Sequence, residues 1–173
     1  ERIEKRGPSK VNPFAVPMMI ANMASGMVSI TFGLQGPVLT DVTACASGNN
    51  ALGRATRMIQ WGDADVMFAG GTEAAVAKTP MAGFAAMHAL SSRDCPPEEA
   101  SCPFDVRRDG FVLGEGSGVL ILEELEHAKK RGAHIYAEVI GYGTNGDAYH
   151  ITAPRPGGEL AARCMKNAIQ DAG

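Results

Sequence analysis

At residues 38–48 the pattern of side chains changes abruptly, within the sequence Val-Leu-Thr-Asp-Val-Thr-Ala-Cys-Ala-Ser-Gly. The run up to Thr43 is rich in β-branched residues, which is typical of a strand. From Ala51 onward, apolar residues recur at the spacings i, i+4 and i+7/i+8, which places them on one face of a helix. The chain is therefore predicted to pass from a strand into a helix within a few residues.

Cys45 lies at this junction, at the first turn of the expected helix. There its thiol meets unpaired backbone N–H groups and the positive end of the helix dipole, and both favour the nucleophilic thiolate. The alternative is an inert buried cysteine, which is the commoner fate of a single cysteine. Position alone leaves these two interpretations evenly balanced.

The residues that follow predict further alternation of helices and strands. Gly62 ends the first helix, residues 65–69 form an apolar run typical of a buried strand, and residues 70–73 break it. Strand, helix and strand at this spacing form a βαβ unit, so we expect a sheet with parallel neighbours. Further helices are expected at 13–30, 80–90, 123–131 and 158–172, and further strands at 119–122 and 135–140.

The helix expected over residues 13–30 is apolar on nearly all sides. Asn12 is its predicted N-cap, and Pro13 occupies the first turn, where a missing N–H group costs nothing. A helix that is apolar all round has to be buried on every face. We therefore expect it to pack against a sheet and a second subunit.

Composition excludes several classes of protein. A chain of 173 residues with 45% hydrophobic and 20% charged residues is ordinary for one globular domain. The net charge of −3 gives no overall attraction to nucleic acid, and polar residues interrupt every apolar stretch before it could span a membrane.

The four cysteines lack zinc-site spacing, so we expect reduced thiols and no bound metal. The chain begins without Met, and we expect residues 1–173 to be a single partial domain, an internal piece of a longer protein.

Three segments carry a resemblance to a known family: Thr43–Gly48, Gly62–Gly71 and Asp109–Gly118. In their residues and in their order along the chain, these segments resemble the motifs of the β-ketoacyl-acyl-carrier-protein synthases, most closely the elongating type II enzymes of bacteria and plastids. The resemblance covers nearly the whole chain. It implies an α/β protein, the N-terminal half of the duplicated thiolase-like αβαβα fold, with a mixed, largely parallel sheet.

The resemblance also implies a chemistry, because the family's nucleophile is the cysteine that matches Cys45. Such an enzyme loads an acyl chain on this sulfur and condenses it with malonyl carrier protein, giving a 3-oxoacyl carrier protein in fatty acid biosynthesis. The family's two catalytic histidines and its lysine belong to motifs that do not occur in these 173 residues, so we expect this piece alone to be inactive. No metal or organic cofactor is implied beyond the phosphopantetheine arm of the acyl carrier protein.

Three substrate-binding residues are implied in the same way. Phe84 matches a position that lines the acyl pocket, although simple core packing explains it equally well. His150 and Thr152, within Asp147–Pro154, match positions along the pantetheine tunnel. For His150 the alternative is a side chain that is satisfied by hydrogen bonds within its own loop.

Two further residues are implied to contact the acyl carrier protein. Lys10 matches a basic position at the entrance that the acidic carrier uses, and a solvated loop is the alternative for residues 1–11. His88 stands where close relatives carry an arginine, and this difference weakens the expected contact with a phosphate or carboxylate. Family members are homodimers, and we expect one here, located in the cytoplasm or a plastid, with neither nucleic acid nor membrane insertion.

Three alternatives to this assignment stay open. A degradative thiolase would use the same nucleophile on coenzyme A, but the Gly62–Gly71 and Asp147–Pro154 segments favour the synthase. A polyketide ketosynthase would use the same chemistry, and this segment separates the two poorly. A non-catalytic chain-length factor is a dimer partner that usually lacks the nucleophile, so Cys45 argues against it.

Overall fold

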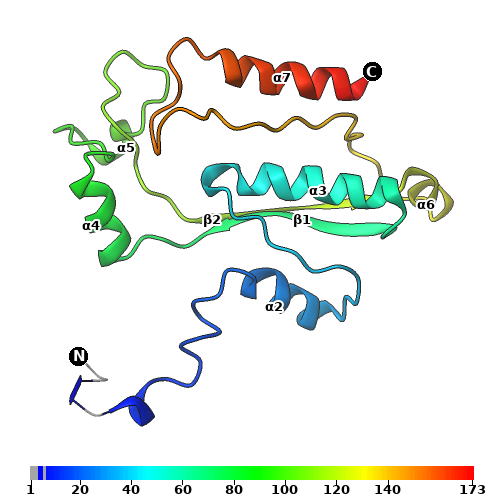
Figure 1. The fold of residues 1–173 in the computed structure, drawn as a ribbon, viewed down its shortest axis with the longest axis horizontal. Helices are drawn as coiled ribbons and strands as arrows, with labels where there is room; N and C mark the ends of the chain where they lie inside the picture. Colours follow the sequence, from blue (N-terminus) through cyan, green and yellow to red (C-terminus); the bar gives the residue numbers. More distant parts are fainter. Residues whose placement is uncertain (1–3, 6) are drawn as a thin grey trace. The chain divides into compact units, whose positions relative to one another are not determined.

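The structure is a computed structural model and describes residues 4–5 and 7–173. Figure 1 shows its ribbon, coloured along the sequence. The chain divides into two compact units. Unit 1 comprises the described residues up to Ala69 together with Leu120–Gly173, and unit 2 comprises Gly70–Val119. The two strands, β1 (Val66–Glu73) and β2 (Gly116–Glu123), pair with each other, and each contributes residues to both units.

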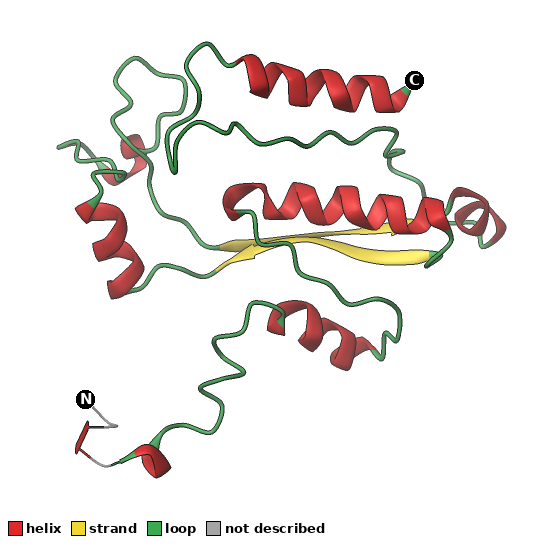
Figure 2. Ribbon diagram, viewed as in Figure 1, coloured by secondary structure: helices red, strands yellow, loops and turns green. Residues whose placement is uncertain are grey.

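The helices are mostly those that the sequence predicts (Figure 2). They are η1 (Pro8–Lys10), α2 (Met23–Phe32), η2 (Ala44–Ala46), α3 (Ser47–Trp61), α4 (Lys78–Ala86), α5 (Pro97–Ala100), α6 (Leu125–Lys130) and α7 (Glu159–Ala172). Gly62 ends α3 with a left-handed φ of 81°, which confirms the predicted C-terminus. Within residues 4–5 and 7–173, none of these helices combines the length and the apolar character that crossing a membrane requires.

The β1–β2 pair is antiparallel, since the Glu124 N–H donates to the Asp65 carbonyl at 2.9 Å while Gly70 lies against Gly118 further along. The parallel neighbours expected for the βαβ unit are not present in the described part of the chain. Residues 38–43 and 135–140, both predicted as strands, are extended but belong to no strand there. A strand is completed by the hydrogen bonds of a neighbour, and the described residues place none beside these two segments.

The expected break in the strand at Gly70 and Gly71 is also wrong, because β1 continues to Glu73. The structure gives Gly70 a different role. A Cβ atom at this position would lie 2.0 Å from the Gly118 carbonyl oxygen, so only glycine allows the backbone of β2 to approach this closely.

The long helix expected over residues 13–30 begins later than predicted. Residues 13–19 form irregular turns, and α2 starts at Met23. The reason is Pro17, which has no N–H group to donate and disfavours the helical conformation of the residue before it. Gly33 ends α2 in a left-handed conformation, and Phe32 stacks on Phe68 of β1 with ring centroids 6.0 Å apart.

In unit 1 an extended stretch at residues 139–145 runs between α3 and α7 (Figure 1). Two glycines allow it to lie against the backbone of α7. A Cβ atom at Gly141 would lie 2.3 Å from the Ala168 carbonyl oxygen, and one at Gly143 would lie 2.3 Å from that of Cys164. On the other side, a Cβ atom at Gly53 of α3 would lie 2.3 Å from the Tyr142 ring. The absence of side chains at these three positions therefore sets the spacing of the three segments.

The chain leaves an unusual amount of its surface exposed. Its accessible area is 13462 Å², whereas a folded monomer of 18.1 kDa has about 8,000 Å². In the part of the chain that the structure describes, the buried hydrophobic residues are Ala55, Met58, Ala69 and Ala128. The apolar helix α2, which is expected to be buried, is exposed in the described part of the chain; Ile30, for example, is 73% exposed. The exposed apolar side chains need further protein around them to complete a core.

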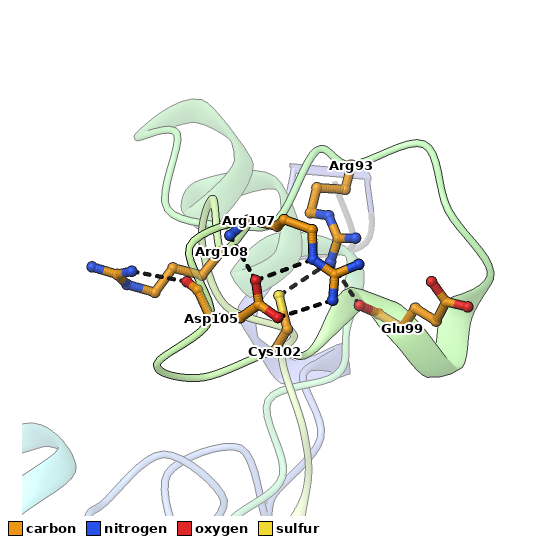
Figure 3. Close-up of polar contacts among 6 residues, drawn as sticks. All are labelled: Arg93, Glu99, Cys102, Asp105, Arg107 and Arg108. Carbon is orange, nitrogen blue, oxygen red and sulfur yellow. Dashed lines mark hydrogen bonds and ion pairs between the residues drawn. The ribbon is translucent and has the colours of Figure 1, made fainter.

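Unit 2 is organised by charged side chains in the loop around Asp105 (Figure 3). The Arg107 guanidinium donates to both carboxylate oxygens of Asp105, at 3.1 and 2.9 Å, and this pairing holds the pKa of Asp105 well below its usual range. Beside it, the Arg93 guanidinium donates to the Glu99 carbonyl at 2.7 Å and to the Cys102 sulfur at 3.1 Å. The loop is thus fixed by side-chain contacts in place of regular secondary structure.

In unit 1, Glu123 at the end of β2 anchors α6. Its carboxylate accepts two hydrogen bonds from Arg131, at 2.7 and 2.6 Å, and one contact of 2.6 Å joins it to His127 Nδ1. The hydrogen bonds from Arg131 and His127 lower the pKa of Glu123 to about 2. The ordinary pKa of this carboxyl is 4.5, so the carboxylate stabilises the folded state above that pH and loses this effect as the pH falls toward 2.

We expect Glu123→Gln to lower the free energy of unfolding most at neutral pH. The glutamine amide is uncharged and has only one oxygen, so it cannot accept both hydrogen bonds from Arg131. The difference from the parent protein should shrink as the pH falls from 4.5 toward 2, because Glu123 itself becomes protonated as the pH passes through its folded pKa of about 2. Urea unfolding at several pH values measures this. Glu126→Gln is the matched control, because Glu126 makes only an exposed pair with Lys129. A difference that is independent of pH would contradict the prediction.

Candidate active site

Cys45 lies in η2, the single 3-10 turn that leads directly into α3. The predicted position before a helix start is confirmed, although the residues before the turn are extended chain without a strand partner. Cys45 is exposed. The residue before it, Ala44, has a φ of 51°, a left-handed conformation that costs energy for any residue with a Cβ atom. The thiol is therefore presented by a strained turn at the positive end of a 15-residue helix.

Hydrogen bonds close this turn from both sides. The Ser47 hydroxyl donates to the Ala44 carbonyl at 2.7 Å and accepts the Thr43 N–H at 2.9 Å. The Ala46 N–H donates to the Thr43 carbonyl at 3.1 Å. The first turn of a helix also leaves backbone N–H groups without helical partners, and Cys45 lies just before this turn of α3.

A chain of side-chain contacts that the sequence analysis missed reaches this turn from residue 142. The Tyr142 hydroxyl donates to Asn50 Oδ1 at 2.7 Å, and Asn50 Nδ2 donates to the Thr43 hydroxyl at 2.7 Å. The available signal was Gly53, because glycine inside a helix is unfavourable and indicates a close neighbour. That neighbour, Tyr142, lies 89 positions further along the chain, and no residue near Gly53 in the sequence identifies it.

The structure brings the two predicted tunnel residues together in one loop. His150 Nδ1 accepts the backbone N–H groups of Thr152 at 3.1 Å and Ala153 at 3.0 Å. Asp147 closes the same loop by accepting the Arg155 N–H at 2.9 Å. An accepting Nδ1 requires the proton of the neutral ring to sit on Nε2. His150 thus makes the loop contacts that its alternative interpretation describes.

The remaining predicted residues belong to other segments of the chain. Lys10 is exposed in η1, and residues 1–3 and 6 of the same basic stretch lie outside the described residues. In unit 2, His88 is exposed just after α4 with a φ of 55°, and Phe84 of α4 packs edge-to-face on Phe111 with centroids 5.2 Å apart. Within the described residues, no hydrogen bond joins Cys45 to any of these side chains.

Comparison with known sequences gives two family matches. Residues 1–128 match the N-terminal domain of the beta-ketoacyl synthases, and residues 136–173 match the C-terminal domain of the same family. Curated relatives named 3-oxoacyl-[acyl-carrier-protein] synthase 2 are 57% identical in Coxiella burnetii, 55% in Rhizobium meliloti and 54% in Staphylococcus aureus. These alignments cover 96%, 99% and 100% of this chain but only 40%, 41% and 43% of the relatives.

Solved structures agree with the sequence matches. A type II polyketide ketosynthase, solved with its acyl-carrier protein and bound to a hexaketide, is 42% identical with a TM-score of 0.92 over 96% of this chain and 41% of that one. A beta-ketoacyl synthase from Burkholderia phymatum is 38% identical with a TM-score of 0.90 over 99% and 41%. The predicted α/β, thiolase-like fold class is thereby confirmed. With the family model matching most of its residues, this chain belongs to the beta-ketoacyl synthase family.

Proposed function

We propose that the full-length protein containing this chain is a 3-oxoacyl-[acyl-carrier-protein] synthase that elongates fatty acyl chains. The observation that carries the proposal is Cys45, the family's nucleophile position, held in a strained turn at the start of α3. The chain spans about two fifths of the curated relatives, whose names state this activity. Their identity of 54–57% supports the same activity here.

In the proposed reaction the Cys45 thiolate attacks the carbonyl carbon of an acyl thioester on the carrier protein. A carbon–sulfur bond forms on Cys45, and the bond between the carbonyl carbon and the phosphopantetheine sulfur breaks. The carrier's phosphopantetheine leaves as a thiolate and takes up the proton that the Cys45 thiol gave up on ionising. Malonyl carrier protein then loses carbon dioxide, and its carbanion attacks the Cys45 thioester. The new carbon–carbon bond gives the 3-oxoacyl carrier protein and releases the Cys45 sulfur as a thiolate.

The described residues supply two parts of this chemistry. Cys45 provides the nucleophile, and its own N–H is a donor for the oxyanion that develops in both carbonyl additions. The decarboxylation machinery, two histidines and a lysine in the family, belongs to segments outside this chain. We therefore propose that residues 1–173 are a partial domain that is inactive on its own.

The same proposal gives roles to the other predicted residues. Phe84 lines the acyl pocket, supported by its half-buried ring against Phe111. His150 and Thr152 form the loop beside the pantetheine arm, supported by their shared hydrogen bonds. Lys10 and His88, both exposed, contact the carrier protein.

The wider setting follows from the same assignment. The solved ketosynthase complex with an acyl-carrier protein supports such a carrier as partner. Exposed apolar side chains on α2, with Ile30 73% exposed, support a homodimer that covers them. The bacterial relatives favour a cytoplasmic location, and the reaction needs no cofactor beyond the carrier's phosphopantetheine.

A polyketide ketosynthase is the second candidate, because one of the solved structures with this backbone is a type II polyketide enzyme at 42% identity. The higher identity to the curated fatty acid enzymes favours the first candidate. The two differ in product. A fatty acid synthase makes one two-carbon extension per cycle, whereas a polyketide enzyme keeps extending an unreduced chain.

The test is to incubate the purified full-length protein with an acyl carrier protein thioester and malonyl carrier protein. Mass spectrometry should show a 3-oxoacyl carrier protein that is two carbons longer, with release of one carbon dioxide per condensation. Repeated extension of an unreduced chain would favour the polyketide enzyme. Turnover of coenzyme A thioesters without use of malonyl groups would indicate a thiolase and overturn the proposal.

A further inference from the structure

We propose that Asn50 is a positioning residue for Cys45, and that Tyr142 holds Asn50 in place. This inference rests on the proposed function of Cys45 as a nucleophile. Asn50 uses both ends of its amide: Oδ1 accepts from the Tyr142 hydroxyl at 2.7 Å, and Nδ2 donates to the Thr43 hydroxyl at 2.7 Å. The two contacts hold the amide at both ends, between the hydroxyl groups of Tyr142 and Thr43.

The position of Tyr142 is itself fixed. Its ring lies against Gly53, where a Cβ atom would come within 2.3 Å of it, and its N–H donates to Asp171 Oδ2 at 2.8 Å. Asp171 of α7 also pairs with Arg57 of α3, which ties the two helices to each other around the tyrosine. The hydroxyl of Tyr142 is therefore delivered to Asn50 by a rigid frame within unit 1.

At the other end, Thr43 is the residue from which the strained turn begins. Its side chain is held by Asn50, its N–H by Ser47 Oγ at 2.9 Å, and its carbonyl by the Ala46 N–H at 3.1 Å. Ala44, with a φ of 51°, and then Cys45 follow directly. A left-handed alanine persists only where its surroundings fix it. Asn50 supplies the side-chain contact that connects this turn with the rest of unit 1.

The test compares three variants of the full-length protein. Asn50→Ala removes both amide contacts, and Tyr142→Phe removes only the hydroxyl while keeping the ring against Gly53. Asn49→Ala is the matched control, since Asn49 is the same residue type one position earlier in α3 and is exposed. The readouts are the rate constant for alkylation of Cys45 by iodoacetamide, followed by peptide mapping, and kcat and KM for condensation.

We expect Asn50→Ala to slow alkylation of Cys45 and to lower kcat by about tenfold, since small displacements of a reacting group are costly. KM for malonyl carrier protein should stay within about twofold. Tyr142→Phe should act in the same direction, and the double variant should be no slower than Asn50→Ala, because both act through one amide. Asn49→Ala should match the parent protein.

Parent-like alkylation and kcat in Tyr142→Phe and Asn50→Ala, in a protein that condenses, would overturn the inference and leave the proposed function standing. A parent protein that forms no acyl-Cys45 would instead refute the proposed function. If Asn50→Ala does not fold, Tyr142→Phe decides alone, and unchanged alkylation of Cys45 in that variant counts against the inference.

Discussion

Cys45→Ala is expected to abolish condensation by the full-length protein, lowering kcat by about three orders of magnitude or more. Alanine has no nucleophile, so the acyl group cannot leave the carrier and no substrate is formed for the second step. The turn around residue 45 is closed by Thr43 and Ser47 and not by the thiol, so the variant should fold. The measurement is the rate of 3-oxoacyl carrier protein formation, together with the mass of any acylated protein.

The control is Cys95→Ala, which makes the same chemical change at a half-buried cysteine outside the candidate site. This variant should keep the parent rate and still form an acyl adduct. Iodoacetamide should label Cys45 before Cys95 or Cys102, because only Cys45 lies at the start of a long helix. Normal condensation by Cys45→Ala would show that another group carries the acyl chain, and earlier labelling of Cys102 would contradict the higher reactivity expected of Cys45.

Local sequence signals are enough to place Cys45 directly before a helix. The change from β-branched residues to small residues and then to helical periodicity places Cys45 before α3, and Gly62 marks the end of that helix. The pattern over residues 159–172 is equally clear, because α7 has one apolar and one polar face. These features depend on residues close together in the chain, which is why sequence alone reveals them.

Other features depend on distant residues, and their predictions are wrong or missing. Residues 38–43 have the composition of a strand, but a strand also requires a neighbour, and sequence composition does not say where that neighbour lies. Gly70 has the local character of a strand break, whereas it permits a close approach by Gly118. In each case the deciding group is far away in the sequence.

The candidate site shows the same division. The proposed nucleophile is found from the segment around Cys45, but the Tyr142–Asn50 hydrogen bond joins residues 92 positions apart and becomes visible only with coordinates. The late start of α2 is a different kind of error. The effect of Pro17 on a helix is evident in the sequence, but the prediction gave more weight to the apolar pattern around it. Periodicity alone is therefore weaker evidence than periodicity checked against each proline.

Gly143→Ala is expected to destabilise the full-length protein strongly, because it forces α7 away from the extended stretch at residues 139–145. The added Cβ atom would lie 2.3 Å from the Cys164 carbonyl oxygen and 2.7 Å from the Ala168 nitrogen. Both are backbone atoms of a helix, so no side chain can rotate to make room. The overlap should lower the free energy of unfolding by roughly 1–3 kcal/mol or more.

Gly146→Ala is the matched control, since a Cβ atom there would meet nothing within 4 Å and the same conformational restriction is introduced. It should change the free energy of unfolding by ~0.5 kcal/mol or less. Any stabilisation would come from the lower conformational entropy of the unfolded chain. Urea unfolding of both full-length variants measures the difference, and limited proteolysis should cut near α7 first in Gly143→Ala. Equal stability of the two variants would mean that α7 does not pack on Gly143 in the assembled protein, because no relaxation of side chains alone can relieve a clash between a Cβ atom and helix backbone.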